Sequence, residues 1–260
     1  MELNLHVWGD PSAPPVVCLH GVNGHGRRYR RLAEERLAGR FRVLAPDLRG
    51  HGNSGWEPPW TFATHVHDVL ETLDAAGVRR ARWVGHSFGG RLVLELAALA
   101  PERIERAALL DPAIQPLPHI GYDFAERERA DRVFDSADEA IEARLETGVL
   151  TPREHLEEEM REHLVEHPDG RFRFRYCQAA VVSIYGELTT PPPPPETLRV
   201  QTLLVHAGEF GLVRDDQIDA YRAALGDLID VLEVPGGHMV YWDAYEQTAD
   251  AVGRFLENPR

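Results

Sequence analysis

Short apolar runs alternate with helix-forming stretches along most of the chain. The inner runs, such as 16–19, are apolar at every position. Strands buried on both faces have this character, which is typical of a parallel sheet covered by helices on both sides. The alternation therefore predicts a three-layer α/β fold with a mostly parallel sheet. The expected strands are 3–8, 16–20, 42–46, 82–86, 107–111, 203–207 and 231–234, with helices over 27–37, 62–76, 87–100, 216–225 and 247–256.

The alternation stops between residues 113 and 199. Charged, amphipathic patterns there predict three helices, over 126–132, 137–147 and 152–167. We find no convincing buried strand among them, and a stiff run of prolines leads back to the sheet. We therefore expect a core of residues 1–112 and 200–260 with an inserted helical lid, because loops at the carboxyl ends of parallel strands surround ligand sites. A surface excursion with no role is the alternative.

The charge, apolar content and cysteines of the chain limit the kinds of molecule that it can bind and the compartment that it can occupy. With 28 basic and 42 acidic residues the formal net charge is −14, which disfavours nucleic acid as a partner. No run is long and apolar enough to span a membrane, and the start does not resemble a signal peptide. Cys18 and Cys177 lie far apart and suggest free thiols in a reducing compartment. We expect a cytoplasmic protein with a small-molecule substrate; monomer and homodimer both remain open.

The sequence Gly85-His86-Ser87-Phe88-Gly89 lies between an expected strand and an expected helix. This Gly-x-Ser-x-Gly pattern is the nucleophile elbow, in which a sharp strand-to-helix turn holds the serine at its apex. Glycine is needed two positions before and after, because larger side chains would collide in so tight a turn. The pattern in this context predicts Ser87 as the nucleophile of a hydrolase.

A serine hydroxyl needs a general base, because it is a weak nucleophile at its ordinary pKa. His238 follows the last expected strand in a glycine-containing loop that can reach back to Ser87. His65 and His67 are two apart on an expected helix and face different sides. Neither a His-Glu-x-x-His nor a Cys-x-x-Cys pattern is present, so the sequence implies no metal.

Two backbone amides are expected to bind the oxyanion that forms when Ser87 attacks a carbonyl. One belongs to Phe88, directly after the nucleophile, and the other to Val22 in the glycine-rich loop after the second strand. Trp56 and Met239 are candidates to line an apolar substrate pocket. Packing between lid and core is the alternative for both.

These motifs together resemble the α/β-hydrolase family, in particular its lid-bearing bacterial esterases, lactonases, haloperoxidase-like enzymes and carbon–carbon bond hydrolases. The resemblance implies an α/β-hydrolase fold and a Ser–His–acid triad that needs no cofactor. In the family the motif around Asp47, Arg49 and His51 is chiefly structural, so we assign these residues no catalytic role. The resemblance rests on the Ser87 elbow together with 20–21, 45–54, 101–104 and 237–239, in the family's order.

The acid of the triad stays open. The family usually places it after the last strand but one, in a Gly-x-x-Asp pattern, and Gly211 occupies that position in this chain. Asp111 is our preferred candidate, because some members carry the acid at the end of the strand that follows the nucleophile helix. Glu209, next to the vacant position, is the second candidate, and Asp215 or Asp216 is the third.

The resulting expectation is a serine hydrolase that cleaves a small ester or lactone through a Ser87 acyl-enzyme. A carbon–carbon bond hydrolase would use the same residues, and a haloperoxidase-like side activity is compatible with them. A non-catalytic small-molecule-binding module is the alternative from a different class.

Overall fold

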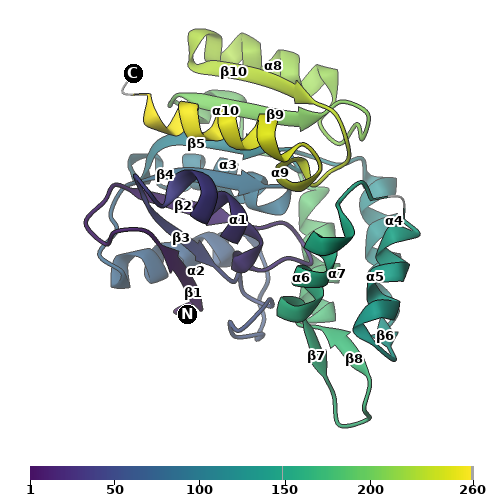
Figure 1. The fold of residues 1–260 in the computed structure, drawn as a ribbon. Coiled ribbons are helices and arrows are strands. Elements are labelled where there is room, and N and C mark those ends of the chain that lie inside the picture. Colours follow the sequence, from purple (N-terminus) through teal and green to yellow (C-terminus); the bar gives the residue numbers. More distant parts are fainter. Residues whose placement is uncertain (148, 259–260) are drawn as a thin grey trace.

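The computed structural model describes residues 1–147 and 149–258 (Figure 1). Its main sheet has seven strands. From one edge of the sheet to the other they are β1 (Leu5–Trp8), β3 (Arg42–Pro46), β2 (Pro15–Leu19), β4 (Ala81–His86), β5 (Ile104–Leu110), β9 (Thr202–Ala207) and β10 (Ile229–Val234). The edge strand β1 runs antiparallel to β3, and the other neighbouring pairs run parallel. This confirms the mostly parallel sheet that the apolar runs predict.

Helices cover both faces of this sheet and bury two separate apolar clusters. One face packs against α2 (Phe62–Ala75), α3 (Phe88–Leu99) and α8 (Asp215–Leu225). The other packs against the helical segment 26–37, which includes α1 (Arg30–Leu32), and against α9 (Val240–Asp243) and α10 (Tyr245–Glu257). Val16 and Val17 are successive residues of β2 but enter opposite clusters. Successive side chains of a strand point to opposite faces, and both faces are buried here, so this run must be apolar throughout.

Residues 113–199, which we call the insertion, lie between β5 and β9. They differ from the purely helical segment expected, because a small three-stranded antiparallel sheet joins the helices. The elements are α4 (Pro118–Arg129), β6 (Val133–Phe134), α5 (Ala137–Leu145), α6 (Arg153–His163), β7 (Leu164–Glu166), β8 (Phe172–Phe174) and α7 (Gln178–Leu188). The helix expected over 152–167 ends at His163, where β7 begins. Figure 1 shows α6 and α7 nearer to the core than α5.

One buried guanidinium fixes both connections of the insertion to the core. Arg91 lies on α3, and its Nη1 donates to the carbonyl of Ile114, where the insertion starts, at 2.6 Å. The same side chain donates to the carbonyls of Thr190 and Pro191, where the insertion ends, at 3.2 and 2.9 Å. Because α3 begins directly after Ser87, this clamp ties the position of the insertion to the helix that follows the elbow.

Ion pairs join the insertion to the core along α6. Arg27 pairs with Glu162 at 2.9 Å, and Arg28 Nε donates to Glu159 at 2.7 Å. Burial raises the pKa of the Glu159 carboxyl, but the charge of Arg28 and the charge and hydrogen bond of His25 together outweigh that effect and hold the pKa well below its usual range. Glu159 therefore stays ionised in this contact.

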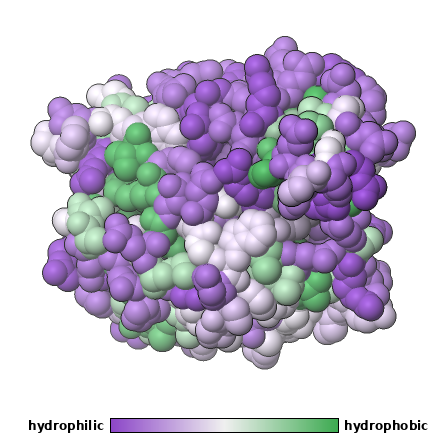
Figure 2. All heavy atoms as spheres, turned by 90° about the horizontal axis from the view of Figure 1, so that it is seen from below, coloured by the Kyte–Doolittle hydropathy of each residue, from purple (hydrophilic) through white to green (hydrophobic). Residues whose placement is uncertain are grey.

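The surface reflects the high content of charged residues. Figure 2 shows one face that is mainly hydrophilic, with apolar residues in separate patches. Among residues 1–147 and 149–258, none of the helices has the length and apolar character needed to cross a membrane.

Candidate active site

Ser87 occupies the turn between β4 and α3 in a strained conformation, with φ 53° and ψ −116°. A Cβ added at Gly85 would lie 2.5 Å from the carbonyl oxygen of Gly89, and one added at Gly89 would lie 2.1 Å from that of Leu19. Neither position tolerates a side chain without moving backbone. The local sequence therefore forces the strand to turn sharply into the helix, and it leaves Ser87 at the apex.

Asp111 lies beside the elbow because β5 pairs with β4. Leu110 is in register with His86, so Asp111 and Ser87 follow directly from paired residues. The Asp111 side chain is fully buried. Its Oδ1 accepts a hydrogen bond from the amide of Ala207 at 3.2 Å, and its Oδ2 lies 2.6 Å from Nδ1 of His238. A carboxylate held in this way fixes the tautomer in which Nδ1 of the imidazole carries the proton.

His238 reaches this position from the loop after β10. Its ring centroid lies 4.5 Å from that of His86, and His86 Nε2 donates to the His238 carbonyl at 2.9 Å. Burial, reinforced by the charge of His238, holds the pKa of His86 well below its usual range. His86 therefore stays neutral at physiological pH. It does not compete with His238 for a proton from Ser87.

Ser87 and Asp111 thus lie at the carboxyl ends of the adjacent strands β4 and β5, and His238 reaches Asp111 from the loop after β10, two strands beyond β5. Within the described part of the chain, the Ser87 hydroxyl and the His238 ring do not form a hydrogen bond. Such bonds are often long in unliganded sites and tighten when substrate binds. The side chain of His238 is 26% exposed and Ser87 is 7% exposed, so little of the nucleophile is open to solvent.

The other acid candidates lie in different surroundings. Glu209 is exposed, and no hydrogen bond of its carboxylate is found among the described residues. Gly211 has φ 69° and faces open space. Asp216, in the first turn of α8, pairs with Arg214 at 2.9 Å. Among these candidates, Asp111 is the one that contacts His238.

Phe210 is a residue of the site that sequence reasoning missed. Its ring stacks on that of His238, with centroids 4.9 Å apart and planes 16° from parallel. The signal available in the sequence was an aromatic residue directly before Gly211, in the loop where the family's acid usually lies. A pattern alone does not give the direction of a loop side chain, so the stack was not foreseeable.

The two expected oxyanion donors lie on segments next to Ser87. Phe88 is the first residue of α3. The loop that carries Val22 passes close by, because a Cβ added at Gly21 would lie 3.0 Å from Cβ of Ser87. The amide of Gly24 donates to the carbonyl of Gly21 at 3.1 Å and closes the turn around Val22. The roles of both amides stay predictions.

The two expected substrate-contacting residues differ in burial. Trp56 is 41% exposed, in the loop before α2. Met239 is buried and packs in the apolar cluster under α9 and α10. The burial of Met239 is explained by packing, and a contact of either residue with substrate stays a prediction.

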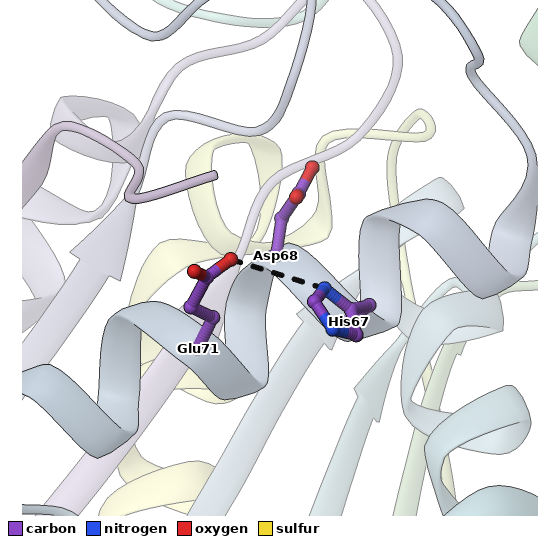
Figure 3. Close-up of side chains that lie close together, drawn as sticks. All are labelled: His67, Asp68 and Glu71. Carbon is purple, nitrogen blue, oxygen red and sulfur yellow. Dashed lines mark ion pairs between the residues drawn. The ribbon is translucent and has the colours of Figure 1, made fainter.

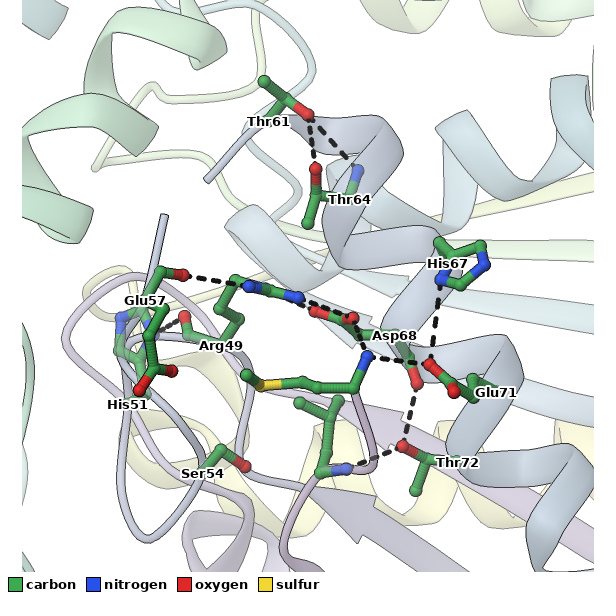
Figure 4. A network of polar contacts seen from close by, with 12 residues as sticks. Arg49, His51, Ser54, Glu57, Thr61, Thr64, His67, Asp68, Glu71 and Thr72 are labelled. Carbon is green, nitrogen blue, oxygen red and sulfur yellow. Dashed lines mark hydrogen bonds and ion pairs between the residues drawn. The ribbon is translucent and has the colours of Figure 1, made fainter. Parts of the chain in front are cut away.

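Arg49 and His51, from the motif that the family resemblance marked as structural, belong to a polar network (Figure 4). Arg49 donates to both carboxylate oxygens of Asp68, at 2.6 and 2.9 Å, and to the carbonyl of Glu57. His51 Nδ1 donates to the carbonyl of Arg49 at 3.0 Å, and burial lowers the pKa of His51 to about 4. Asp47 accepts from the amides of 26 and 53. These contacts hold the 47–54 loop in place and engage the side chains of Asp47 and Arg49.

His67, Asp68 and Glu71 lie close enough together to hold a cation (Figure 3). Their oxygens already have cationic partners, however. Asp68 binds Arg49, and both Asp68 and Glu71 bind the ammonium group of Met1 at 2.6 and 2.7 Å. His67 is exposed and lies 3.9 Å from Glu71. We assign no metal to this group, because exposed clusters of this kind are common without one.

Comparison with known proteins places this geometry in a family. Residues 14–245 match the model of the alpha/beta hydrolase fold. The chain is 35% identical to "Lipase LipV" of Mycobacterium tuberculosis, over 92% of this chain and 93% of that protein. It is 32% identical to "Esterase YbfF" of Escherichia coli, over 62% of this chain and 61% of that protein. Among solved structures, E-2-(acetamidomethylene)succinate hydrolase superimposes with a TM-score of 0.88 at 22% identity, covering 98% of this chain and 95% of that one.

Proposed function

The chain belongs to the α/β-hydrolase fold family, and from this premise we propose that it is a serine hydrolase that cleaves carboxylic esters. The observation that carries the proposal is the 2.6 Å contact between Asp111 and His238, next to a strained serine at the elbow. A small-molecule-binding module has no need to bury a carboxylate against an imidazole beside such a serine. Catalysis by acyl transfer needs all three groups.

In the proposed reaction, Nε2 of His238 takes the proton of the Ser87 hydroxyl as Oγ attacks the ester carbonyl. The amides of Phe88 and Val22 bind the oxyanion. His238 then gives its proton to the departing alkoxide, which leaves as the alcohol, and an acyl-enzyme remains on Ser87. Water loses a proton to His238 and attacks the acyl carbon, after which the proton returns to Oγ and the carboxylic acid leaves. Asp111 stabilises the imidazolium in both halves of the reaction.

Two relatives that align with the chain at 35% and 32% identity are named as a lipase and an esterase, which supports an ester substrate. A lactone is a cyclic ester and would react by the same steps. We propose that the insertion acts as a lid, because the amide of its first residue, Ala113, donates to the carbonyl of Ser87 at 3.0 Å and Arg91 clamps the insertion to α3. A cytoplasmic location is proposed from the free thiols of Cys18 and Cys177.

Replacing the nucleophile tests this function. We expect Ser87→Ala to lower kcat on p-nitrophenyl esters of short and medium acyl chains by about 10⁴-fold or more. A fluorophosphonate probe should label the wild type and leave Ser87→Ala unlabelled. Ser12→Ala is the matched control, because Ser12 is an exposed serine bonded to Asp10, and it should retain full activity.

Two results would overturn the assignment. Undiminished hydrolysis by Ser87→Ala would place the chemistry elsewhere. A wild type that is folded yet neither labelled nor active on any ester or lactone tested would favour a binding module.

A further inference from the structure

The loop after β9 carries an aromatic ring where the family usually places an acid. Its backbone is fixed at the strand end, because the amides of Phe210 and Gly211 both donate to the carbonyl of Ala207 at 3.2 Å. Gly211 then turns the chain with φ 69°, in the left-handed region that favours glycine. The loop therefore holds Phe210 beside His238 in a defined orientation.

Burial in the core does not explain the position of Phe210. It is a large apolar side chain that is 45% exposed, whereas Phe41, Phe62 and Phe88 are buried in the apolar clusters. The ring contact found for it is the near-parallel stack on His238, 4.9 Å between centroids. A half-exposed aromatic side chain is tolerated where one of its faces makes a specific contact.

The hydrogen bond to Asp111 does not by itself fix the imidazole. It restrains Nδ1, but small changes of χ1 and χ2 that keep this contact still tilt the ring and change the direction of Nε2. A parallel ring against its face restricts that tilt and so directs Nε2. The π face also favours the imidazolium that forms when His238 takes the serine proton.

From this geometry we infer that Phe210 is a positioning residue, which fixes the plane of the His238 ring and thereby the direction of Nε2 toward Ser87. The inference rests on the proposed function, since it assigns Phe210 a part in the same site. It predicts that an aromatic ring at this position is required, and that apolar volume alone is insufficient.

Steady-state kinetics on a p-nitrophenyl ester provide the first test. Phe210→Leu and Phe210→Ala should lower kcat by about two- to tenfold, the range expected for one lost aromatic pair, with KM changed less than kcat. Phe210→Tyr should restore most of kcat, because its hydroxyl can be solvated at this exposed site. Leu99→Ala is the matched control, since Leu99 is also an exposed apolar residue and is 60% exposed.

A spectroscopic readout separates the inference from the proposed function. Ring protons of His238, assigned by their loss in a His238→Asn variant, should resonate upfield in the wild type, because they lie over the face of Phe210. The upfield shift should persist in Phe210→Tyr and disappear in Phe210→Leu. This measurement does not require an active enzyme.

Each failure has its own signature. If the wild type hydrolyses no ester, the proposed function fails, whatever the spectrum shows. If the wild type is active and Phe210→Leu keeps both its kcat and its His238 resonances, the inference alone is wrong. A rise in KM without loss of kcat would also overturn it, because Phe210 would then contact substrate. Equal losses in the Leu and Tyr variants would overturn it by pointing to loop folding.

Discussion

The ends of β5 and β9 both lie near His238, but they present different chemical groups to its ring. At the end of β5 the carboxylate of Asp111 is fully buried, and both its oxygens accept hydrogen bonds. At the end of β9 the carboxylate of Glu209 is exposed, and the loop presents the ring of Phe210 to the imidazole. One strand end supplies charge to Nδ1 and the other supplies an aromatic face.

The difference shows that strand register decides which carboxylate contacts His238. Asp111 follows Leu110, which is paired with His86, so its carboxylate emerges beside the elbow. Asp111 also has φ 41°, a left-handed conformation that Asp adopts more readily than most residues. Glu209 is closer in sequence to the family's usual acid position, but it points its carboxylate into water, where it cannot orient an imidazole.

Of the variants that test the different roles of these two strand ends, Asp111→Asn should have the largest effect. We expect kcat for ester hydrolysis to fall by about 10³- to 10⁴-fold, as in related triads. The amide oxygen can still accept from Ala207, which directs the amide NH₂ at Nδ1 and favours the tautomer protonated on Nε2. That tautomer cannot take the serine proton. A kcat within tenfold of wild type, in a variant with unchanged melting temperature, would show that Asp111 is not the acid.

Returning an acid to the β9 loop should recover part of this loss. Gly211→Asp in the Asp111→Asn background places a carboxylate at the family's usual position, where a Cβ meets open space. The φ of 69° is one that Asp tolerates better than most side chains. We expect kcat about tenfold above that of Asp111→Asn alone, short of wild type because the new carboxylate lacks the buried hydrogen bonds. A double variant no more active than the single one would show that this loop cannot bring a carboxylate at position 211 to His238.

The smallest effect is expected at Glu209. Glu209→Gln removes an exposed charge that makes no contact with His238 among the described residues, so kcat should stay within about twofold of wild type. This variant is also the matched control for Asp111→Asn, since both change a carboxylate to an amide. A loss comparable to that of Asp111→Asn would reverse the roles of the two strand ends.

Local patterns were sufficient to predict the core of the fold and to point to two residues of the candidate site. The apolar runs identified all seven main-sheet strands, and the inner runs were the clearest because burial on both faces makes every position of such a strand apolar. The glycines around Ser87 indicated the elbow, because the turn has no room for Cβ atoms. The glycine-containing loop after β10 pointed to His238.

What the sequence left open depends on contacts across the fold. Choosing Asp111 over Glu209 required the contact between Asp111 and His238, which are 127 positions apart. The elements of the insertion were predicted less accurately, because β6, β7 and β8 are two or three residues long and carry no periodic signal. The helix α7 was missed since its β-branched residues and Gly186 lower helix propensity, while its buried side chains stabilise it by packing.

The pairing of Asp111 with His238 is tested most directly by the proton between them. A hydrogen bond of 2.6 Å from Nδ1 to a buried carboxylate should give a far-downfield proton resonance, which His238→Asn would remove and thereby assign. We predict that this resonance is present in the wild type and in Glu209→Gln and is absent in Asp111→Asn. Its persistence in Asp111→Asn, or its loss in Glu209→Gln, would contradict the assignment of Asp111 as the residue that orients His238.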